Sequence, residues 1–194
     1  AIIAIAAAKN SRELTQKIFG DEIGWLPWKR PGFELGLWLA KFCVDNPKAK
    51  GVVLESHGLF TWADDAKECY DLTLRIIQQA MDWFADQTKG AAAFGGARHQ
   101  SLPADQRRAV AARLMPAIRG MVSGLHPMVG HFDDQDAVLE FVNAKGMEPL
   151  AALGTSCPDH FLRPKIRPLV VDFDPAKPDV GATLNGLADA VAAY

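Results

Sequence analysis

One short segment constrains this chain most, because it joins a strand-like run to a histidine beside a glycine and then leads into a helix. Residues 51–62 have the sequence GVVLESHGLFTW. The apolar run is typical of a buried strand, and Gly58 allows the backbone and a ligand to approach closely at the strand end. Functional side chains gather at such ends, which makes His57 a candidate for metal binding or proton transfer. A hydrogen-bonded core histidine is the alternative.

Strand-like and helix-like periods alternate along the chain, which predicts an α/β fold. Helices are expected at 11–19 with Ser11 as the cap, at 34–44, from Asp65 for about six turns, at 103–121, at 134–144, just before Gly154 and at 180–194. Strands are expected at 1–8, 23–28, 51–62, 129–132 and 166–173. The small-residue stretch 90–96 (GAAAFGG) is the expected boundary between 1–90 and 91–194.

Composition excludes several classes of function. The chain has 194 residues, 49% of them hydrophobic, and a net charge of -2 with both signs mixed along its length. It has no basic stripe for nucleic acid, and the apolar run 1–8 is too short to span a membrane. Three widely spaced cysteines suggest reduced thiols in a cytoplasmic protein. The sequence contains no glycine-rich phosphate-binding loop and no GxSxG motif. It also lacks the GxGxxG motif, so a dinucleotide-binding site within these residues is not expected.

A second polar cluster follows residue 154. Cys157 and His160 are only two potential ligands, fewer than a zinc site requires. Asp159, His160 and Arg163 could instead position a polar or phosphorylated substrate, and the simpler interpretation is a polar turn closed by Pro158.

The sequence His131-Phe132-Asp133-Asp134 has a structural explanation. Asp134 is expected to cap the following helix, with His131 at the end of a short strand, so capping accounts for the acidic pair.

Several segments resemble the class II aldolase/adducin family. They are GVVLESHGLFTWADDAKECYDLTLRIIQQAMDWF, with its His-Gly pair and following helix, and GDEIGWLPWKRPGFELGLWLA upstream. GTSCPDHFLRPKIRPLVVDFDP and HFDDQDAVLEFVNAKG are similar to one subgroup, in which a rhamnulose-1-phosphate-aldolase-like domain is fused to a short-chain dehydrogenase.

This resemblance implies a fold and a metal ligand. The fold would be a three-layer α/β/α domain with a mixed, mostly antiparallel sheet, of which 1–90 is the C-terminal part. Residues 91–194 would be a subgroup-specific α/β extension leading toward a dehydrogenase domain that is not in this chain. His57 would be the third histidine ligand of a divalent metal, usually zinc. The other two ligands would come from a His-x-His pair upstream of Ala1, and no such pair occurs in these residues.

The resemblance also implies a reaction. It is the retro-aldol cleavage of a ketose 1-phosphate to dihydroxyacetone phosphate and an aldehyde, by a cytoplasmic homo-oligomer. The acid/base group is expected upstream of Ala1, and NAD(P) only in the dehydrogenase domain. The isolated chain is then expected to be inactive. Two alternatives stay open: a non-catalytic, adducin-like oligomerisation module, and a parent protein best described by its dehydrogenase.

Overall fold

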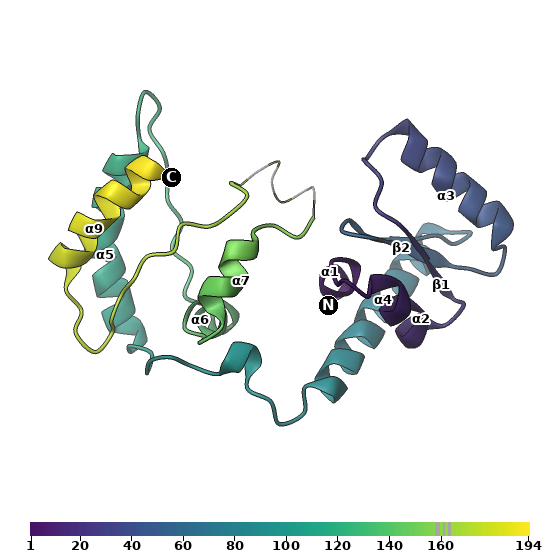
Figure 1. Cartoon of the computed structure of the whole chain (residues 1–194), viewed down its shortest axis with the longest axis horizontal. Coiled ribbons are helices and arrows are strands. Elements are labelled where there is room, and N and C mark those ends of the chain that lie inside the picture. Colours follow the sequence, from purple (N-terminus) through teal and green to yellow (C-terminus); the bar gives the residue numbers. More distant parts are fainter. Residues whose placement is uncertain (158–159, 161, 163) are drawn as a thin grey trace. The chain divides into compact units, whose positions relative to one another are not determined.

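The computed structural model describes residues 1–157, 160, 162 and 164–194. The chain divides into two compact units (Figure 1). The first comprises Ala1–Gly90 with Thr155–Ile166, and the second comprises Ala91–Gly154 with Arg167–Tyr194. Each unit is described by itself below.

A three-stranded mixed sheet organises the first unit. Its strands are β1 (Ile23–Leu26), β2 (Gly51–Leu54) and β3 (Gly58–Thr61), in that order across the sheet. β1 runs parallel to β2, with Trp25 opposite Val53, whereas β2 and β3 are antiparallel, with Val53 opposite Leu59. All four residues of β2 are buried, as expected for a central strand covered on both faces.

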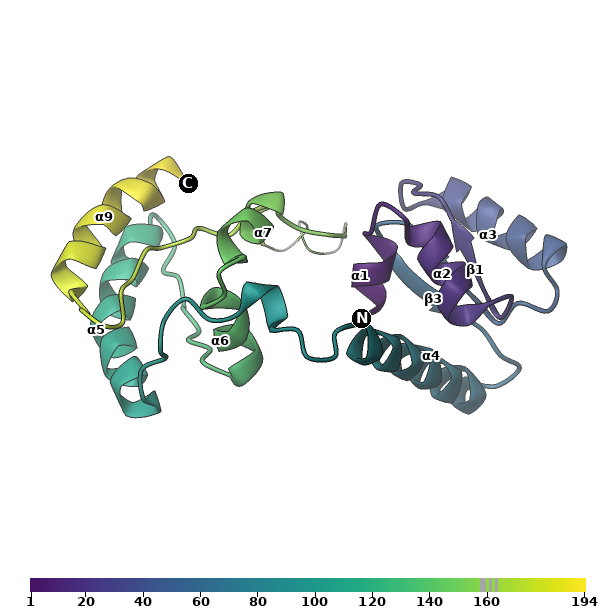
Figure 2. The ribbon, with the colours of Figure 1, turned by 60° about the horizontal axis from the view of Figure 1, so that its bottom comes forward.

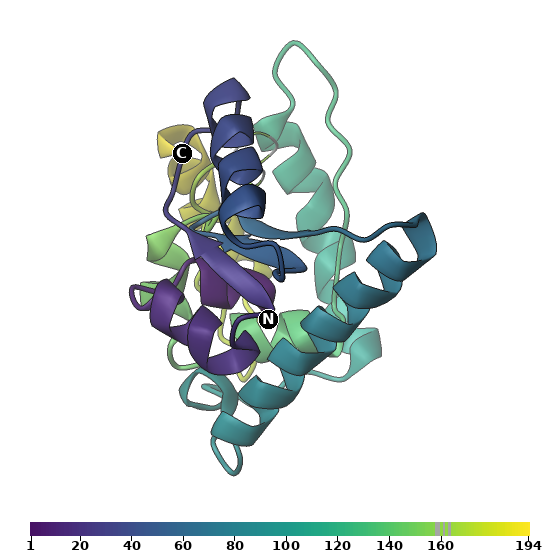
Figure 3. The ribbon, with the colours of Figure 1, turned by 90° about the vertical axis from the view of Figure 1, so that its right-hand side faces the viewer.

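Helices cover both faces of this sheet. α3 (Phe33–Asp45) packs on the face that carries Val52 and Leu54. The opposite face is covered by α1 (Ile2–Ala6), α2 (Ser11–Phe19) and α4 (Ala66–Gln87), which share one buried cluster with Ile23 and Val53. Figure 2 and the end-on view of Figure 3 show the strands between α3 and α4. The predicted three-layer α/β/α arrangement is therefore confirmed.

The strand predicted over residues 1–8 is wrong, because Ile2–Ala6 forms helix α1. Ile5 and Ala6 are completely buried, and Ile2 packs beside them. Apolar residues at i, i+3 and i+4 form one face of a helix, and alanine favours that conformation. A run that is apolar throughout fits a strand equally well, so its period could not separate the two.

The segment 51–62 is a hairpin, where a single strand had been predicted. β2 ends at Leu54, residues 55–57 turn, and β3 begins at Gly58. His57 therefore lies in the turn between two strands, and a whole strand separates it from α4.

Two helix ends test the predicted capping. The Asp65 carboxylate accepts the backbone N–H of Glu68 over 2.9 Å at the start of α4, as predicted. Ser11, in contrast, is the first residue of α2 and makes no cap. Its buried hydroxyl accepts the indole N–H of Trp25 over 2.9 Å instead. This bond fixes α2 to β1.

The second unit is helical over its described residues. It contains α5 (Ala104–Val122), α6 (Asp136–Val142), α7 (Met147–Leu153) and α9 (Val180–Ala193), preceded by the short 3-10 turn Ala93–Gly95. The helices expected at 103–121, before Gly154 and at 180–194 are confirmed. The strands expected at 129–132 and 166–173 are wrong, since both segments are irregular. A strand needs a neighbour to pair with, and the described part of this unit offers only an isolated bridge between Ala97 and Ala144.

Candidate metal centre at the turn between β2 and β3

The turn that carries His57 is held by main-chain hydrogen bonds on both sides. The N–H of Ser56 donates to the carbonyl of Ala6 at the end of α1 over 2.8 Å, and the N–H of His57 donates to Leu54 over 3.1 Å. Ser56 adopts a left-handed conformation with φ of 52°, uncommon for a residue other than glycine. Gly58, at φ of 155°, begins β3. These contacts fix the backbone on each side of His57.

The His57 imidazole has an unsatisfied nitrogen. Its Nδ1 atom is buried and finds no hydrogen-bond partner within the described structure. The ring lies edge-on to Phe60, with centroids 6.1 Å apart and planes at 67°. Buried polar atoms are almost always paired, so a lone imidazole nitrogen calls for an explanation such as a bound ion. Among the described residues, no hydrogen bond from Nδ1 supports the core-histidine alternative.

Glu55 is a carboxylate on the same turn that sequence reasoning did not single out. Its Oε2 atom accepts the backbone N–H of Trp28 over 2.9 Å, and its own N–H donates to Leu26 over 3.0 Å. The backbone bond to Leu26 extends the pairing of β1 with β2 by one residue. The side chain therefore secures the loop after β1. Its position two residues before His57 was the only signal in the sequence.

The described residues do not complete a metal site by themselves. No group of three or more histidine, cysteine, aspartate or glutamate side chains gathers in the part of the chain that the structure describes. One imidazole with a buried free nitrogen fits one coordination position, while zinc in proteins takes three or four protein ligands. His57 can thus supply one ligand to a metal site, and the described residues do not supply a complete set.

The second predicted cluster is only partly described. The backbone N–H of His160 donates to the carbonyl of Cys157 over 3.2 Å, and Cys157 is buried. His160 is exposed, and no hydrogen bond links it to His57 within the described ranges. Asp159 and Arg163 lie outside the described residues.

Asp134 does not cap a helix as predicted. Its carboxylate pairs with the guanidinium of Arg107 at 3.0 Å and 3.1 Å, and both side chains are largely buried. α6 begins later, at Asp136, with Gln135 before it. Asp133 accepts the N–H of Gln135 over 3.0 Å. Structural contacts thus account for both acidic residues, as expected. Asp134, however, forms an ion pair with Arg107 and does not cap a helix.

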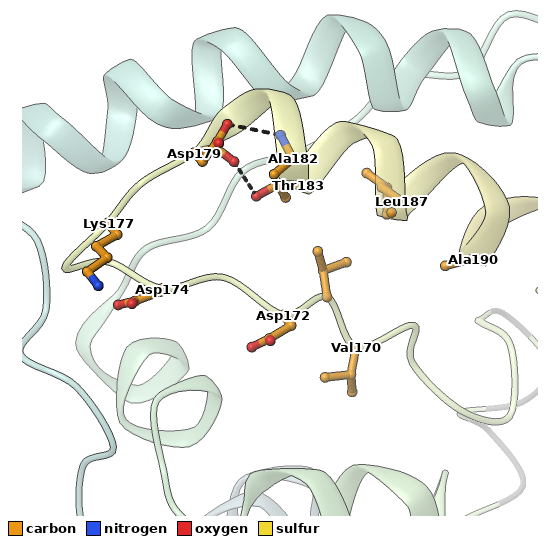
Figure 4. Close-up of a pocket in the computed structure, with 11 residues that line it drawn as sticks. Val170, Asp172, Asp174, Lys177, Asp179, Ala182, Thr183, Leu187 and Ala190 are labelled. Carbon is orange, nitrogen blue, oxygen red and sulfur yellow. Dashed lines mark hydrogen bonds between the residues drawn. The ribbon is translucent and has the colours of Figure 1, made fainter.

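An acidic cavity of about 410 Å³ lies in the second unit, against α9 (Figure 4). Its carboxylates come from Asp172, Asp174 and Asp179, beside Lys177. Asp179 caps α9 by accepting the N–H of Ala182 over 2.9 Å, and Asp174 closes a turn. Local backbone contacts therefore occupy two of the three carboxylates.

A charged pair joins α4 to the loop before β1. The guanidinium of Arg75 donates to both carboxylate oxygens of Glu22, at 2.5 Å and 3.0 Å. These hydrogen bonds, and then the charges of Arg75 and Lys50, hold the pKa of Glu22 below its usual value, although partial burial opposes them. Glu22 in turn raises the pKa of Arg75.

Comparisons with known proteins agree with this architecture. Residues 1–82 match the family model for the class II aldolase and adducin N-terminal domain, and residues 109–194 match that for the second domain of class II aldolases. The chain is 41% identical over 180 residues to the uncharacterized oxidoreductase YuxG of Bacillus subtilis strain 168. That alignment covers 93% of this chain and 26% of the relative, so the chain spans about a quarter of the relative's length.

No solved structure gives a significant match. Among the described helices, none is both long and apolar enough to cross a membrane. The two family matches leave only residues 83–108 between them, and they identify class II aldolase/adducin family domains in this chain.

Proposed function

We propose that this chain is part of a metal-dependent class II aldolase in which His57 is one of the metal ligands. The observation that carries the proposal is the buried, unpaired Nδ1 of His57, on a rigid turn inside the range that matches the aldolase family model. Members of this family generally use a divalent metal. The remaining ligands and the acid/base group are proposed to come from residues outside the 194 of this chain.

The proposed reaction is retro-aldol cleavage of a ketose 1-phosphate, with rhamnulose 1-phosphate as the candidate substrate. Zinc or another divalent cation would polarise the substrate oxygens and so favour cleavage of the carbon–carbon bond. The contribution of this chain is one imidazole, on a turn whose backbone is held by the main-chain bonds of Ser56 and His57. His160, Asp159 and Arg163 are candidates for contacts with the substrate phosphate.

A fused dehydrogenase that uses NAD(P) is proposed for the complete protein. The relative is named an oxidoreductase and is about four times as long as the aligned region, which supports an additional redox domain there. The product aldehyde is a chemically suitable substrate for such a domain. A cytoplasmic location stays a prediction.

A non-catalytic, adducin-like module is the second candidate. The absence of a three-ligand cluster from the described residues is compatible with it, and equally with an aldolase whose other ligands lie outside these residues. The two candidates differ in whether the complete gene product binds metal through His57, since a non-catalytic module has no need for that ligand.

The test uses the complete open reading frame that encodes these residues. Wild-type protein and His57→Ala are purified, their metal content is measured by elemental analysis, and dihydroxyacetone phosphate release from rhamnulose 1-phosphate is assayed. The aldolase proposal expects stoichiometric metal and turnover in the wild type, with both strongly reduced in His57→Ala. Metal-free and inactive wild type would favour the non-catalytic module. If the wild type binds metal but does not cleave rhamnulose 1-phosphate, the proposed substrate is excluded, whereas the role of His57 as a metal ligand is not.

The 194-residue chain provides a separate check. A single imidazole gives weak metal binding, so this chain is expected to bind zinc weakly and to show no aldolase turnover. Tight, stoichiometric zinc in the isolated chain would contradict the proposed ligand set and would point to His131, Cys157 or His160 as additional ligands.

A further inference from the structure

Helix α3 is apolar on two opposite faces. Its inner face packs on the sheet through Leu35, Leu39 and Phe42. Its outer face carries the exposed side chains Phe33, Leu37, Ala40 and Val44, of which Phe33 is 84%, Leu37 53% and Val44 79% exposed. A helix that packs on a sheet normally has charged and polar residues on its outer face. The outer face of α3 departs from this pattern.

The exposed apolar residues form one continuous line. They follow each other at intervals of four, three and four residues, which is the spacing of a coiled-coil seam. At 3.6 residues per turn they lie within a narrow sector of the helix, roughly opposite the inner residues. We call Phe33, Leu37, Ala40 and Val44 the outer stripe. Among the described residues of the first unit, no other element packs against it (Figures 1 and 2).

We propose that the outer stripe packs against the outer stripe of a second copy of this chain, with the two α3 helices antiparallel about a twofold axis. In this arrangement Leu37 lies opposite the partner's Ala40, and Phe33 lies opposite the partner's Val44. Each contact then sets a larger side chain against a smaller one, as close packing requires. A twofold contact uses the same surface on both copies, and this stripe is complementary to itself.

Charges beside the stripe favour the antiparallel direction. Glu34 and Lys41 lie on the same flank of α3, two turns apart. Antiparallel helices bring Glu34 close to the partner's Lys41, and the twofold axis repeats the pair. In a parallel pair this flank would face the opposite flank of the partner, so Glu34 and Lys41 would not meet across the contact. In the single chain Glu34 pairs with Lys29 at 2.5 Å and Lys41 with Asp45 at 2.8 Å. Such exposed pairs are weak and can rearrange.

The size of the stripe predicts a weak dimer. One helix of this length provides an interface at the small end of the range for specific complexes. Association should therefore depend on concentration, and it does not depend on a metal at His57.

The first test measures the mass of the 194-residue chain by sedimentation equilibrium over a range of concentrations. The wild type should form a dimer reversibly. Leu37→Lys should weaken the dimer by at least about tenfold, because it places two charges in an apolar contact. Met81→Lys on α4 is the matched control, since Met81 is 52% exposed and lies outside the stripe. The control should associate like the wild type.

Three results would overturn the proposal. The wild type could remain a monomer at every concentration, or Leu37→Lys could associate as tightly as the wild type. Leu37→Lys could also lower the thermal stability of a chain that is always monomeric, which would mean that the second unit of the same chain covers the stripe.

The second test addresses direction. Glu34→Lys and Lys41→Glu should each weaken the dimer, and the double variant should restore it, because each pair then has opposite charges again.

Cys43 gives an independent readout, since it is an exposed free thiol on α3. Antiparallel helices hold the two Cys43 residues about 14 Å apart along the axis, too far for a disulfide. Mild oxidation should therefore leave the dimer uncrosslinked. A Cys43–Cys43 disulfide, or a double variant as weak as the singles, would exclude the antiparallel arrangement.

Discussion

Ser56 donates its backbone N–H to the carbonyl oxygen of Ala6 over 2.8 Å, and this bond ties the turn that carries His57 to the end of α1. The next residue but one, Gly58, lies near Ile3 of the same helix. α1 therefore acts as a support for the turn, and the position of His57 depends on a helix far away in sequence. These main-chain bonds fix the backbone at His57, while the imidazole itself packs edge-on against Phe60.

The left-handed conformation of Ser56 predicts an unusual response to substitution. Ser56→Val should lower the free energy of unfolding by about 1–2 kcal/mol, because a β-branched residue is strained at positive φ. Ser56→Gly should cause no loss, since glycine adopts this conformation freely. Urea denaturation of the 194-residue chain measures both. Equal losses in the two variants would show that the Ser56 side chain, not its backbone conformation, is what matters.

Gly24 on β1 is required by the close approach of an aromatic ring. A Cβ atom at this position would come within 2.1 Å of the Phe42 ring. Gly24→Ala should therefore destabilise the first unit by about 1–3 kcal/mol, the usual cost of overpacking. Gly186→Ala is the control, because Gly186 lies within α9 and no atom lies within 4 Å of a Cβ there. In that helix alanine should be neutral or stabilising. A tolerated Gly24→Ala would contradict the packing of α3 on β1.

The buried face of α4 gives a second matched pair. Ile76 is completely buried beneath the sheet, whereas Leu74 on the same helix is 47% exposed. Ile76→Ala should cost about 2–5 kcal/mol, as for other large-to-small core substitutions. Leu74→Ala should cost far less. Thermal or chemical denaturation distinguishes them, and similar losses would mean that α4 packs with a different face.

The lowered pKa of Glu22 predicts a pH-dependent stability. A carboxylate with a lower pKa in the folded state stabilises the fold above its unfolded pKa, about 4.3, and this stabilisation is lost as the pH falls through the folded value. Both partners are partly exposed, so the effect should not exceed about 1 kcal/mol. Glu22→Gln should therefore be less stable than the wild type near neutral pH, and the difference should shrink in acid. A difference that stays constant from about pH 7 to about pH 3 would rule out this contribution.

The first unit could be predicted largely from sequence, because its signals are local. Apolar spacing predicted α3 and α4, and the start of α4 at Asp65 and the end of α2 at residue 19 were both correct. The three-layer arrangement came from the family resemblance. What failed were features that depend on partners distant in sequence. The hydroxyl of Ser11 bonds to Trp25 rather than capping its own helix, and Ile2–Ala6 is helical because of the core that it meets.

The second unit was harder to predict for the same reason. Runs such as 166–173 have strand-like composition, but strand formation depends on a neighbour that pairs with them. The candidate site shows a similar limit. His57 could be singled out from its position before Gly58, yet its unpaired Nδ1 and the support from α1 appear only in the structure.

The proposed metal ligand is tested most directly by the metal content of the complete gene product with and without its imidazole. Wild type, His57→Ala and the control His126→Ala are purified in parallel, and bound metal is measured by elemental analysis together with circular dichroism to verify folding. The account predicts that only His57→Ala loses most of its metal while remaining folded. A folded His57→Ala protein that retains the wild-type metal content would contradict the assignment of His57 as a ligand.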